Sequence, residues 1–229
     1  MNFFSNLVSA EKYLKMINSI GLKNEKLFFV KNFGAIAGNQ SLFKYFKIFE
    51  MIISISKLKG DIIELGVWRG NNLIFIKKVA DYFNLKKKIF GYDWFEGLKE
   101  FGKNDIKLNK RKYKGNKNFI NKLIKNQKLK KIYLIDDDVK NFESHFDKKK
   151  KFCLVYLDLD LYKPTKKVLE IIDKYLIKNG LIVFDQAQKK EWIGEKKALN
   201  EFYKVNKKKY QLIKLNKNFS PDIILKKIK

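Results

Sequence analysis

The sequence predicts an α/β fold, a three-layer sandwich of helices around a seven-stranded, mainly parallel sheet. After Gly60, short apolar runs alternate with amphipathic stretches, which is the pattern of strand–helix–strand units. Runs such as IFGYD (89–93) and LIVFDQ (181–186) are apolar on both faces, as strands covered by helices on each side are. With 229 residues, 45% of them hydrophobic, the chain is long enough for one substantial domain and short for two.

The order of these runs predicts where each strand and helix lies. The expected strands occupy residues 61–65, 88–92, 132–135, 152–157, 181–184, 210–215 and 222–225. The expected helices after the first strand occupy residues 72–83, 139–146, 164–177 and 195–205. The third of these helices has the clearest signals, because Pro164 stands near its start and Asn179-Gly180 follows its end. Two consecutive strands at the C-terminus predict an antiparallel hairpin that completes the sheet.

The first 57 residues show helical spacing rather than the alternation of a strand. Apolar residues recur there at intervals of three and four, as in Leu42, Phe46, Phe49 and Ile53. We therefore expect an N-terminal helical extension, or lid, over residues 1–57 and a main domain over residues 58–229. The segment 99–151 is dense in lysine, and part of it is expected to form a solvated surface loop.

The net charge of +27 is the most unusual figure in the composition. Such a balance normally suggests nucleic acid or an anionic membrane as a partner. All 51 basic residues except Arg69 and Arg111 are lysines, however, whereas proteins that read nucleic acid rely on the planar arginine side chain. Lysine occurs here with abundant Asn, Ile and Phe, the set that AT-rich codons encode. We attribute most of the charge to this composition, which makes nucleic acid an unlikely partner and leaves room for an anionic small molecule or glycan.

The remaining composition excludes several classes of protein. One cysteine and two prolines exclude a disulfide scaffold and a proline-rich fold, and Cys153, inside a predicted strand, is expected in the core. Apolar stretches of about five residues are far shorter than the roughly 20 that span a bilayer, so no transmembrane segment is expected. Residues 1–10 lack the pattern of a signal peptide. We expect a globular, cytoplasmic protein, and a homo-oligomer is compatible with the sequence.

Candidate functional residues follow the apolar runs, because ligands of open parallel sheets bind beyond the carboxyl ends of the strands. After the first strand, Gly66 and Gly70 allow a tight turn, and the helix amides that follow face the crevice. Asp93 ends the second strand, where an acid can accept hydrogen bonds from both ribose hydroxyls of a nucleoside cofactor or cap a turn. Asp138, after the third strand, could cap the next helix or contact an adenine amino group.

The fourth and fifth strands end in further polar residues. Asp158 and Asp160 follow the fourth strand, and Asp185 with Gln186 follows the fifth. Adjacent strand ends would bring Asp158 and Asp185 to one site, where carboxylates repel unless one is protonated or a cation lies between them. Because the ligands would all be oxygen atoms, such a site suits Mg²⁺, Mn²⁺ or Ca²⁺.

With these residues assembled, the chain resembles the class I S-adenosylmethionine-dependent methyltransferases, and more narrowly the macrocin O-methyltransferase-like family, which methylates sugar hydroxyls. The matching stretches are GDIIELGVWRG (60–70), GYDWFEGL (91–98), VYLDLDLYKPTKKVLE (155–170), GLIVFDQ (180–186) and WIGEKKALNEF (192–202). They follow the family's order from about residue 40 to the C-terminus, and the third stretch is the most specific. The resemblance implies the Rossmann-like methyltransferase fold, with its strands in the order 3-2-1-4-5-7-6.

The resemblance also implies which residues hold the cofactor, S-adenosyl-L-methionine. The methionine part of the cofactor would be held by Glu64, Gly66 and Gly70. Its ribose would be held by Asp93, and its adenine would be flanked by Phe95 and Asp138.

A divalent metal, usually Mg²⁺, is implied at Asp158 and at the pair Asp185 and Gln186. Gln186 departs from the family pattern, because it is neutral where an acid or Asn is usual. The expected reaction is an in-line methyl transfer, in which the protein orients the acceptor oxygen and removes its proton, with a metal lowering the pKa of that hydroxyl. Asp158 is the first candidate for metal ligand and base, and Asp160 is the second.

Two other functions remain open at this point. A nucleic-acid methyltransferase or a basic nucleic-acid-binding protein would draw on the charge of +27. A non-catalytic relative would be consistent with Gln186. For the favoured function the acceptor is open among a nucleotide sugar, a lipid-linked glycan and a small glycoside, and residues 1–57 and 99–131 are expected to form the lid above it.

Overall fold

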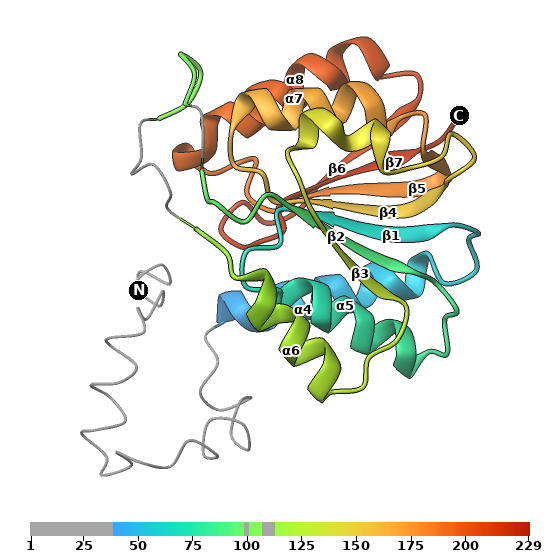
Figure 1. Ribbon diagram of the computed structural model, residues 1–229. Coiled ribbons are helices and arrows are strands. Elements are labelled where there is room, and N and C mark those ends of the chain that lie inside the picture. The colour runs from blue at the N-terminus through green and yellow to red at the C-terminus, as the bar shows by residue number, and fades with distance from the viewer. Residues whose placement is uncertain (1–38, 99–100, 107–112) are drawn as a thin grey trace.

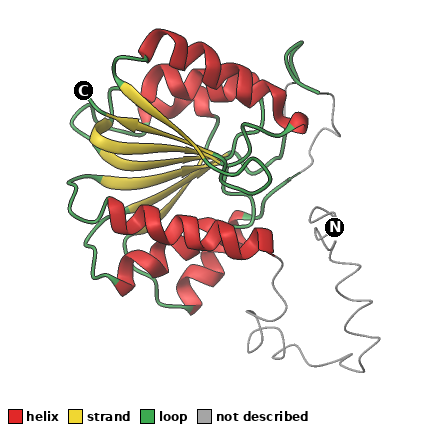
Figure 2. Cartoon of the chain, turned by 180° about the vertical axis from the view of Figure 1, so that it is seen from behind, coloured by secondary structure: helices red, strands yellow, loops and turns green. Residues whose placement is uncertain are grey.

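A computed structural model gives the positions of residues 39–98, 101–106 and 113–229. The predicted N-terminal extension therefore lies mostly outside the described residues, as does part of the predicted lid segment 99–131. The described chain forms three layers, with one sheet between two layers of helices (Figure 2).

The sheet has seven strands in the order β3-β2-β1-β4-β5-β7-β6, so the predicted fold class is confirmed. All pairs are parallel except those of β7, which runs antiparallel to both β5 and β6. The strands are β1 (Asp61–Leu65), β2 (Ile89–Asp93), β3 (Ile132–Asp136), β4 (Phe152–Leu157), β5 (Leu176–Phe184), β6 (Tyr210–Lys214) and β7 (Ile223–Lys227).

Helices cover both faces of this sheet (Figure 1). One face carries α4 (Asn39–Ser54), α5 (Asn71–Tyr82) and α6 (Lys117–Asn126). The other carries α7 (Tyr162–Ile172), α8 (Ile193–Asn206) and the short 3-10 helix η2 (Val139–Ser144), while η3 (Lys190–Trp192) leads into α8. In the part of the chain that the structure describes, no helix combines the length and the apolar character needed to cross a membrane.

Strand alternation divides the core between the two faces. Within β1, Ile62 packs on the side of α4 and α5, whereas Ile63 and Leu65 pack on the side of α7 and α8. Helix α4 contributes Ile48 and Ile52 to the first of these clusters, and both are almost completely buried. The chain is therefore packed into the sheet well before the predicted boundary at residue 57, and the division there remains a prediction.

The region after α7 differs from the sequence prediction of one helix over 164–177. The helix ends at Ile172, and β5 begins already at Leu176, which pairs with Phe152 of β4. The β4–β5 register then shifts, and Asn179, with a φ of 64°, lies in the irregular part of β5. The apolar residues after Ile172 continue the helical spacing of α7, although they pack into the core from a strand. Periodicity alone therefore could not distinguish helix from strand in this segment.

Helix α6 lies in the lysine-rich segment for which a surface loop was expected in part. It begins after Asn116, whose side chain accepts a hydrogen bond from the backbone N–H of Phe119 at 3.0 Å, as a helix cap does. Ile120 is its one fully buried residue, and Leu123 and Ile124 pack beside it. Lysine and asparagine make up the rest of the helix apart from Phe119, and they conceal this short apolar stripe in the sequence.

Candidate active site

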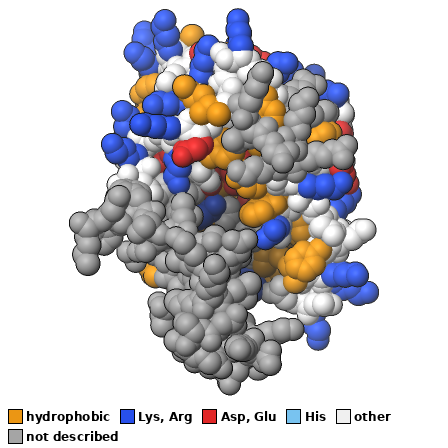
Figure 3. All heavy atoms as spheres, turned by 90° about the vertical axis from the view of Figure 1, so that its left-hand side faces the viewer, with side chains coloured by type: hydrophobic (Ala, Val, Ile, Leu, Met, Phe, Trp, Pro, Cys, Tyr) orange, Lys and Arg blue, Asp and Glu red, His pale blue; other side chains and the backbone are white. Residues whose placement is uncertain are grey.

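A cavity of about 480 Å³ opens at the carboxyl ends of the parallel strands, within the size range of small-molecule sites. Figure 3 views the molecule from this edge and shows Lys and Arg side chains spread over the face, with a few acids between them. Most of the residues predicted from the sequence line the cavity, namely Glu64, Gly66, Asp93, Asp138, Asp158, Asp160, Asp185 and Gln186. Gly70 and Phe95 are not among the described residues in its wall.

The turn between β1 and α5 forms the floor of the cavity. Gly66 has a φ of 90°, and a Cβ added to it would lie 1.9 Å from the carbonyl oxygen of Asp158. Only glycine allows β1 and β4 to approach so closely here. Gly70, with a φ of 77°, caps α5 and faces Ile120 of α6, so it shapes the turn from behind rather than facing a ligand.

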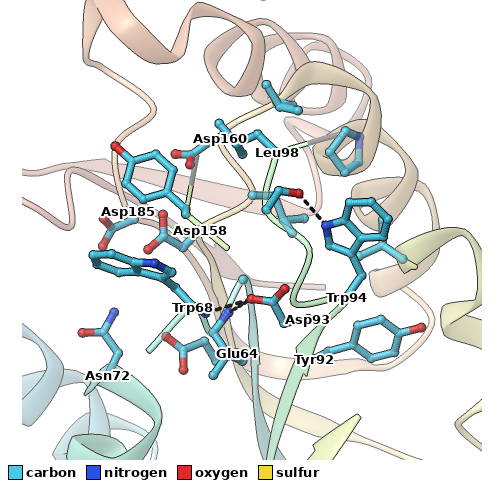
Figure 4. A pocket seen from close by; sticks show the side chains of 18 of the residues that line it. Glu64, Trp68, Asn72, Tyr92, Asp93, Trp94, Leu98, Asp158, Asp160 and Asp185 are labelled. Carbon is cyan, nitrogen blue, oxygen red and sulfur yellow. Dashed lines mark hydrogen bonds between the residues drawn. The ribbon is translucent and has the colours of Figure 1, made fainter. Parts of the chain in front are cut away.

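Asp93 fastens this turn to the end of β2. One carboxylate oxygen accepts hydrogen bonds from the backbone N–H groups of Val67 and Trp68, both at 2.8 Å, and the other accepts from the N–H of Phe95 at 2.7 Å (Figure 4). Burial raises the pKa of Asp93, and these three N–H groups oppose the rise only in part. The structure thus gives Asp93 a bracing role, and its predicted contact with a ribose remains a prediction.

Of the adjacent aromatic residues Trp94 and Phe95, it is Trp94 that lines the cavity. Phe95 has a φ of 58° and is 5% exposed, and it packs into the core on the α5 side of the sheet. Trp94 lines the cavity, and its indole N–H donates to the carbonyl oxygen of Gly97 at 2.5 Å. Asp138 lies in the same wall and caps η2 through a hydrogen bond from the N–H of Lys140. The sequence presents two adjacent aromatic residues, and only the backbone turn decides which one faces a ligand.

Glu64 is a buried acid with an unsatisfied oxygen. It is 1% exposed, and its Oε2 atom has no hydrogen-bond partner among the described residues. Burial raises the pKa of Glu64 to about 8, against an opposing effect of Lys44 and of a hydrogen bond with Asn72. Burying a carboxyl group without a partner is costly, so this oxygen is suited to a cationic ligand group such as an amine.

Beside Glu64, three more acids meet at the ends of β4 and β5 (Figure 4). Burial and the neighbouring Asp185 raise the pKa of Asp158 well above its usual range. Asp185 is different: burial would raise its pKa, but Lys44 together with the hydrogen bonds from Ser220 and Tyr156 outweighs burial, and the pKa is lowered. The pKa values of the two neighbouring carboxyl groups thus shift in opposite directions, as is expected where like charges repel.

Lys44, a residue of α4, was not identified from the sequence. Its Nζ atom lies 2.8 Å from Oδ1 of Asp185, and 21% of its side chain is exposed. Burial lowers the pKa of Lys44, but Asp185 and Asp158 outweigh burial, so the pKa is raised and the ammonium form is retained. Helical spacing in α4 was visible in the sequence, but nothing local showed that this lysine would point into the sheet edge.

Both oxygens of the Asp185 carboxylate contact protein donors. Its Oδ1 atom accepts hydrogen bonds from Ser220 at 2.5 Å and from the hydroxyl of Tyr156, in addition to the ion pair with Lys44. Its Oδ2 atom accepts from the amide nitrogen of Gln186 at 3.1 Å. The donors are concentrated on Oδ1, whereas Oδ2 has one.

The donors present do not fit the divalent metal that was predicted at Asp158, Asp185 and Gln186. The amide oxygen of Gln186 accepts a hydrogen bond from the indole N–H of Trp192 at 2.8 Å, while its nitrogen faces Asp185. Reversing the amide would oppose two N–H donors at Trp192 and two oxygens at Asp185, so the network fixes this orientation. Within the described residues, no group of three or more His, Cys, Asp or Glu side chains is arranged to hold a metal ion. Oδ1 of Asp185 and the amide oxygen of Gln186, two of the oxygens expected to bind a metal, thus already contact protein donors.

A buried acid, Glu195, was also not identified from the sequence. Glu195, in the first turn of α8, is 1% exposed, and neither of its carboxyl oxygens has a hydrogen-bond partner in the described structure. Burial and the neighbouring Asp160 raise its pKa well above the usual range. Asp160 itself has a φ of 61°, a conformation that non-glycine residues adopt rarely and that occurs often at functional sites. Glu195 lies within the stretch WIGEKKALNEF, and an acid in the apolar part of that stretch was the available signal.

The strand order, the antiparallel β7 and the ligand-sized cavity at the carboxyl edge together define the chain as a class I methyltransferase in fold. More narrowly, the chain belongs to the macrocin O-methyltransferase family, because the model described as "Macrocin-O-methyltransferase (TylF)" matches residues 34–219. The resemblance noted in the sequence motifs is therefore confirmed.

Individual relatives agree with this family. The chain is 26% identical over 136 residues to the "8-demethyl-8-(2,3-dimethoxy-alpha-L-rhamnosyl)-tetracenomycin-C 4'-O-methyltransferase" of Streptomyces olivaceus, a match that covers 55% of this chain. The match covers 52% of that relative, so the chain spans about half the length of the curated protein.

Two solved structures of CalS11 are also similar. The first, described as calicheamicin methyltransferase, has a TM-score of 0.77 and 19% identity, covering 95% of this chain and 93% of that one. The second, an apo structure described as TDP-rhamnose 3'-O-methyltransferase, has a TM-score of 0.73 and 20% identity, covering 95% of both chains. At these identities the likeness shows a shared fold.

Proposed function

We propose that this protein is an S-adenosylmethionine-dependent O-methyltransferase that acts on a hydroxyl group of a sugar. The observation that carries the proposal is the convergence of Glu64, Gly66 and Asp158 on one cavity at the carboxyl edge of a methyltransferase sheet. Family membership and the sugar-methylating relatives support the same reaction.

The cavity offers separate contacts for the parts of the cofactor. The unsatisfied Oε2 of Glu64 suits the cationic amine of the methionine moiety, and the glycine turn at Gly66 lets a ligand approach the backbone. Asp93 keeps a free lone pair on Oδ1, which accepts only from the N–H of Phe95, so this oxygen can still accept from a ribose hydroxyl. Trp94 and Asp138 are placed to flank adenine, with Trp94 replacing the predicted Phe95.

Bound S-adenosylmethionine supplies a methyl group already activated by the sulfonium. Asp158 then has to take the proton of the acceptor hydroxyl as the oxygen–methyl bond forms and the carbon–sulfur bond breaks, its electron pair going to sulfur. A carboxyl group whose pKa is raised by burial and by Asp185 is a better proton acceptor than an ordinary one once it is ionised. The positive charge of the cofactor favours that ionisation. Asp160 is the second candidate for this role.

The sugar acceptor is proposed to be anionic, such as a nucleotide-linked sugar or an acidic glycan. Lys140, Lys163 and Lys167 line the cavity together with Arg69, all with exposed side chains. These cations would attract phosphate or carboxylate groups of an acceptor. Mass spectrometry of activated sugars incubated with protein and cofactor tests the proposal, through a single added methyl group on the acceptor.

Calorimetric titration of the full chain with S-adenosylmethionine is the first test of the function. We expect one binding site per chain, and no binding would overturn the proposal in favour of a non-catalytic relative.

Asp158→Asn separates chemistry from binding. Because Asn cannot take a proton but keeps the size of the side chain, methyl transfer should fall by about 10²- to 10⁴-fold while the affinity for the cofactor changes little. Asp160→Asn tests the second candidate in the same way, and it should retain much more activity if Asp158 is the base. Turnover of Asp158→Asn at the rate of the unchanged protein would exclude Asp158 as the base.

A further inference from the structure

Lys44 is a partly buried cation in an acid-lined cavity, and the reaction described above assigns it no role. Its side chain extends from α4, with Nζ 5.8 Å from the centre of the Tyr156 ring and 2.8 Å from Asp185. Its charge also acts on Asp158 and Glu64, which are the other acids facing this part of the cavity. One ammonium group therefore lies among several acids and is paired directly with Asp185.

The position of this ammonium is the position where a metal was expected. Asp158 and Asp185 are the acids that the family resemblance implied as ligands, and Lys44 is bound to one and close enough to influence the other. Gln186 is turned so that its nitrogen faces Asp185 and its oxygen is held by Trp192. The neutral Gln186 and the cation of Lys44 both leave less need for a divalent positive charge at this position.

We propose that the ammonium of Lys44 takes the place of a divalent metal in this protein, so that the site binds no divalent metal and methyl transfer proceeds without one. This inference rests on the proposed function. Lys44 holds the carboxylate of Asp185 in place through the ion pair at 2.8 Å, in the same cavity wall as Asp158, the proposed base. Lys44 is thus a positioning residue that acts through the two acids.

An ion pair with a purely structural role would have different consequences. Its removal would lower stability, but it would not create a metal site, because the acids would simply take up protons. A cation that replaces a metal leaves behind two carboxylates and a space when it is removed, and such a site attracts a hard divalent ion. Metal binding by variants of Lys44 therefore distinguishes the two roles without any need for the acceptor.

The first experiment uses Mn²⁺ as the probe and the unchanged full-length protein. Free Mn²⁺ is measured by electron paramagnetic resonance at pH 8, with and without S-adenosylhomocysteine. We expect no saturable binding. One Mn²⁺ per chain that Mg²⁺ displaces and that Asp185→Asn abolishes would overturn the proposal.

The second experiment removes the lysine. Lys44→Ala should gain one Mn²⁺ site per chain, whereas the control Lys47→Ala should gain none, since Lys47 lies on the same helix but pairs with the exposed Glu50 at 2.6 Å. Lys44→Met keeps the apolar stem of the side chain and serves if the alanine variant does not fold. If a variant of Lys44 folds and gains no Mn²⁺ site, the proposal that Lys44 takes the place of a metal is wrong.

Activity gives an independent result once cofactor binding has been shown by calorimetry. The rate of methyl transfer should be the same in EDTA as in Mg²⁺, and Lys44→Met should lower it on the order of tenfold to a hundredfold. Loss of activity in EDTA with recovery in Mg²⁺ would overturn the proposal. Absence of cofactor binding would instead contradict the proposed function, so the two failures are distinguishable.

Discussion

The buried carboxyl group of Glu64 makes the free energy of unfolding depend on pH. Its pKa is raised to about 8 by burial, whereas in the unfolded chain it titrates near 4.5. Between these values the folded protein holds a proton that the unfolded chain releases. The contribution of Glu64 to the free energy of unfolding therefore falls as the pH rises from about 4.5 to about 8.

Glu64→Gln should remove this dependence on pH. Without ligand, the free energy of unfolding of the variant relative to the unchanged protein should rise between pH 5 and pH 8, by up to about 1.4 kcal/mol per pH unit. Urea unfolding at several pH values measures it. Glu50→Gln, at an exposed position on α4, is the control and should give a flat difference. Parallel curves for Glu64→Gln and the unchanged protein would contradict the assigned protonation.

At the scale of residues, the sequence predicted the acids better than their partners. Asp93, Asp158 and Asp185 follow apolar runs, and parallel topology necessarily gathers such residues at one edge. Lys44 and Ser220 reach the same site from segments far apart in the sequence, and each looks like an ordinary surface residue in its own segment. Contacts of that kind depend on tertiary packing, so no local pattern announces them.

The connection between β1 and α5 is the element on which the cofactor half of the cavity depends. Gly66 closes the turn, and Asp93 fastens it through two backbone N–H groups. A side chain at position 66 would collide with the carbonyl group of Asp158 and would also require a φ that side chains disfavour. The turn therefore has little freedom to adapt.

Gly66→Ala should lower the free energy of unfolding by about 2–4 kcal/mol and weaken cofactor binding by more than its effect on stability explains. Gly102→Ala is the matched control, because a Cβ there has no neighbour closer than 3.5 Å. Thermal unfolding and calorimetric titration of both variants make the comparison. Equal stability of the two variants would contradict the close approach of β1 and β4.

Elements with strong apolar runs were predictable, and elements that depend on context were not. Strands β1 to β4 were placed to within one residue at each end, and in β1 and β4 nearly every residue of the apolar run is buried. The start of β5 was assigned to a helix, since Tyr175 and Leu176 fit the spacing of apolar residues in a helix as well as that in a strand. Helix α6 has a cap at Asn116 but few apolar residues, so its sequence resembles a loop.

At the scale of the whole molecule, the net charge of +27 could guide an anionic ligand in two ways. Either lysines over the entire surface contribute, or only those near the cavity do. The Debye length is about 10 Å at 0.1 M salt and about 30 Å at 0.01 M. At moderate salt, only lysines near the cavity can act on an acceptor. Lys163 and Lys167 lie in the cavity wall on α7, whereas Lys207 and Lys208 follow the far end of α8.

Two double variants of equal charge distinguish these cases. At 0.1 M salt, Lys163→Gln with Lys167→Gln should raise KM for an anionic sugar acceptor by about threefold to tenfold, with kcat nearly unchanged, because the lost cations act on binding. Lys207→Gln with Lys208→Gln removes the same two charges and should leave KM unchanged. At 0.01 M salt the effect of the second pair should emerge, since screening no longer hides it. Equal effects of both pairs at 0.1 M salt would show that the lysines of the cavity wall have no special part in attracting the acceptor.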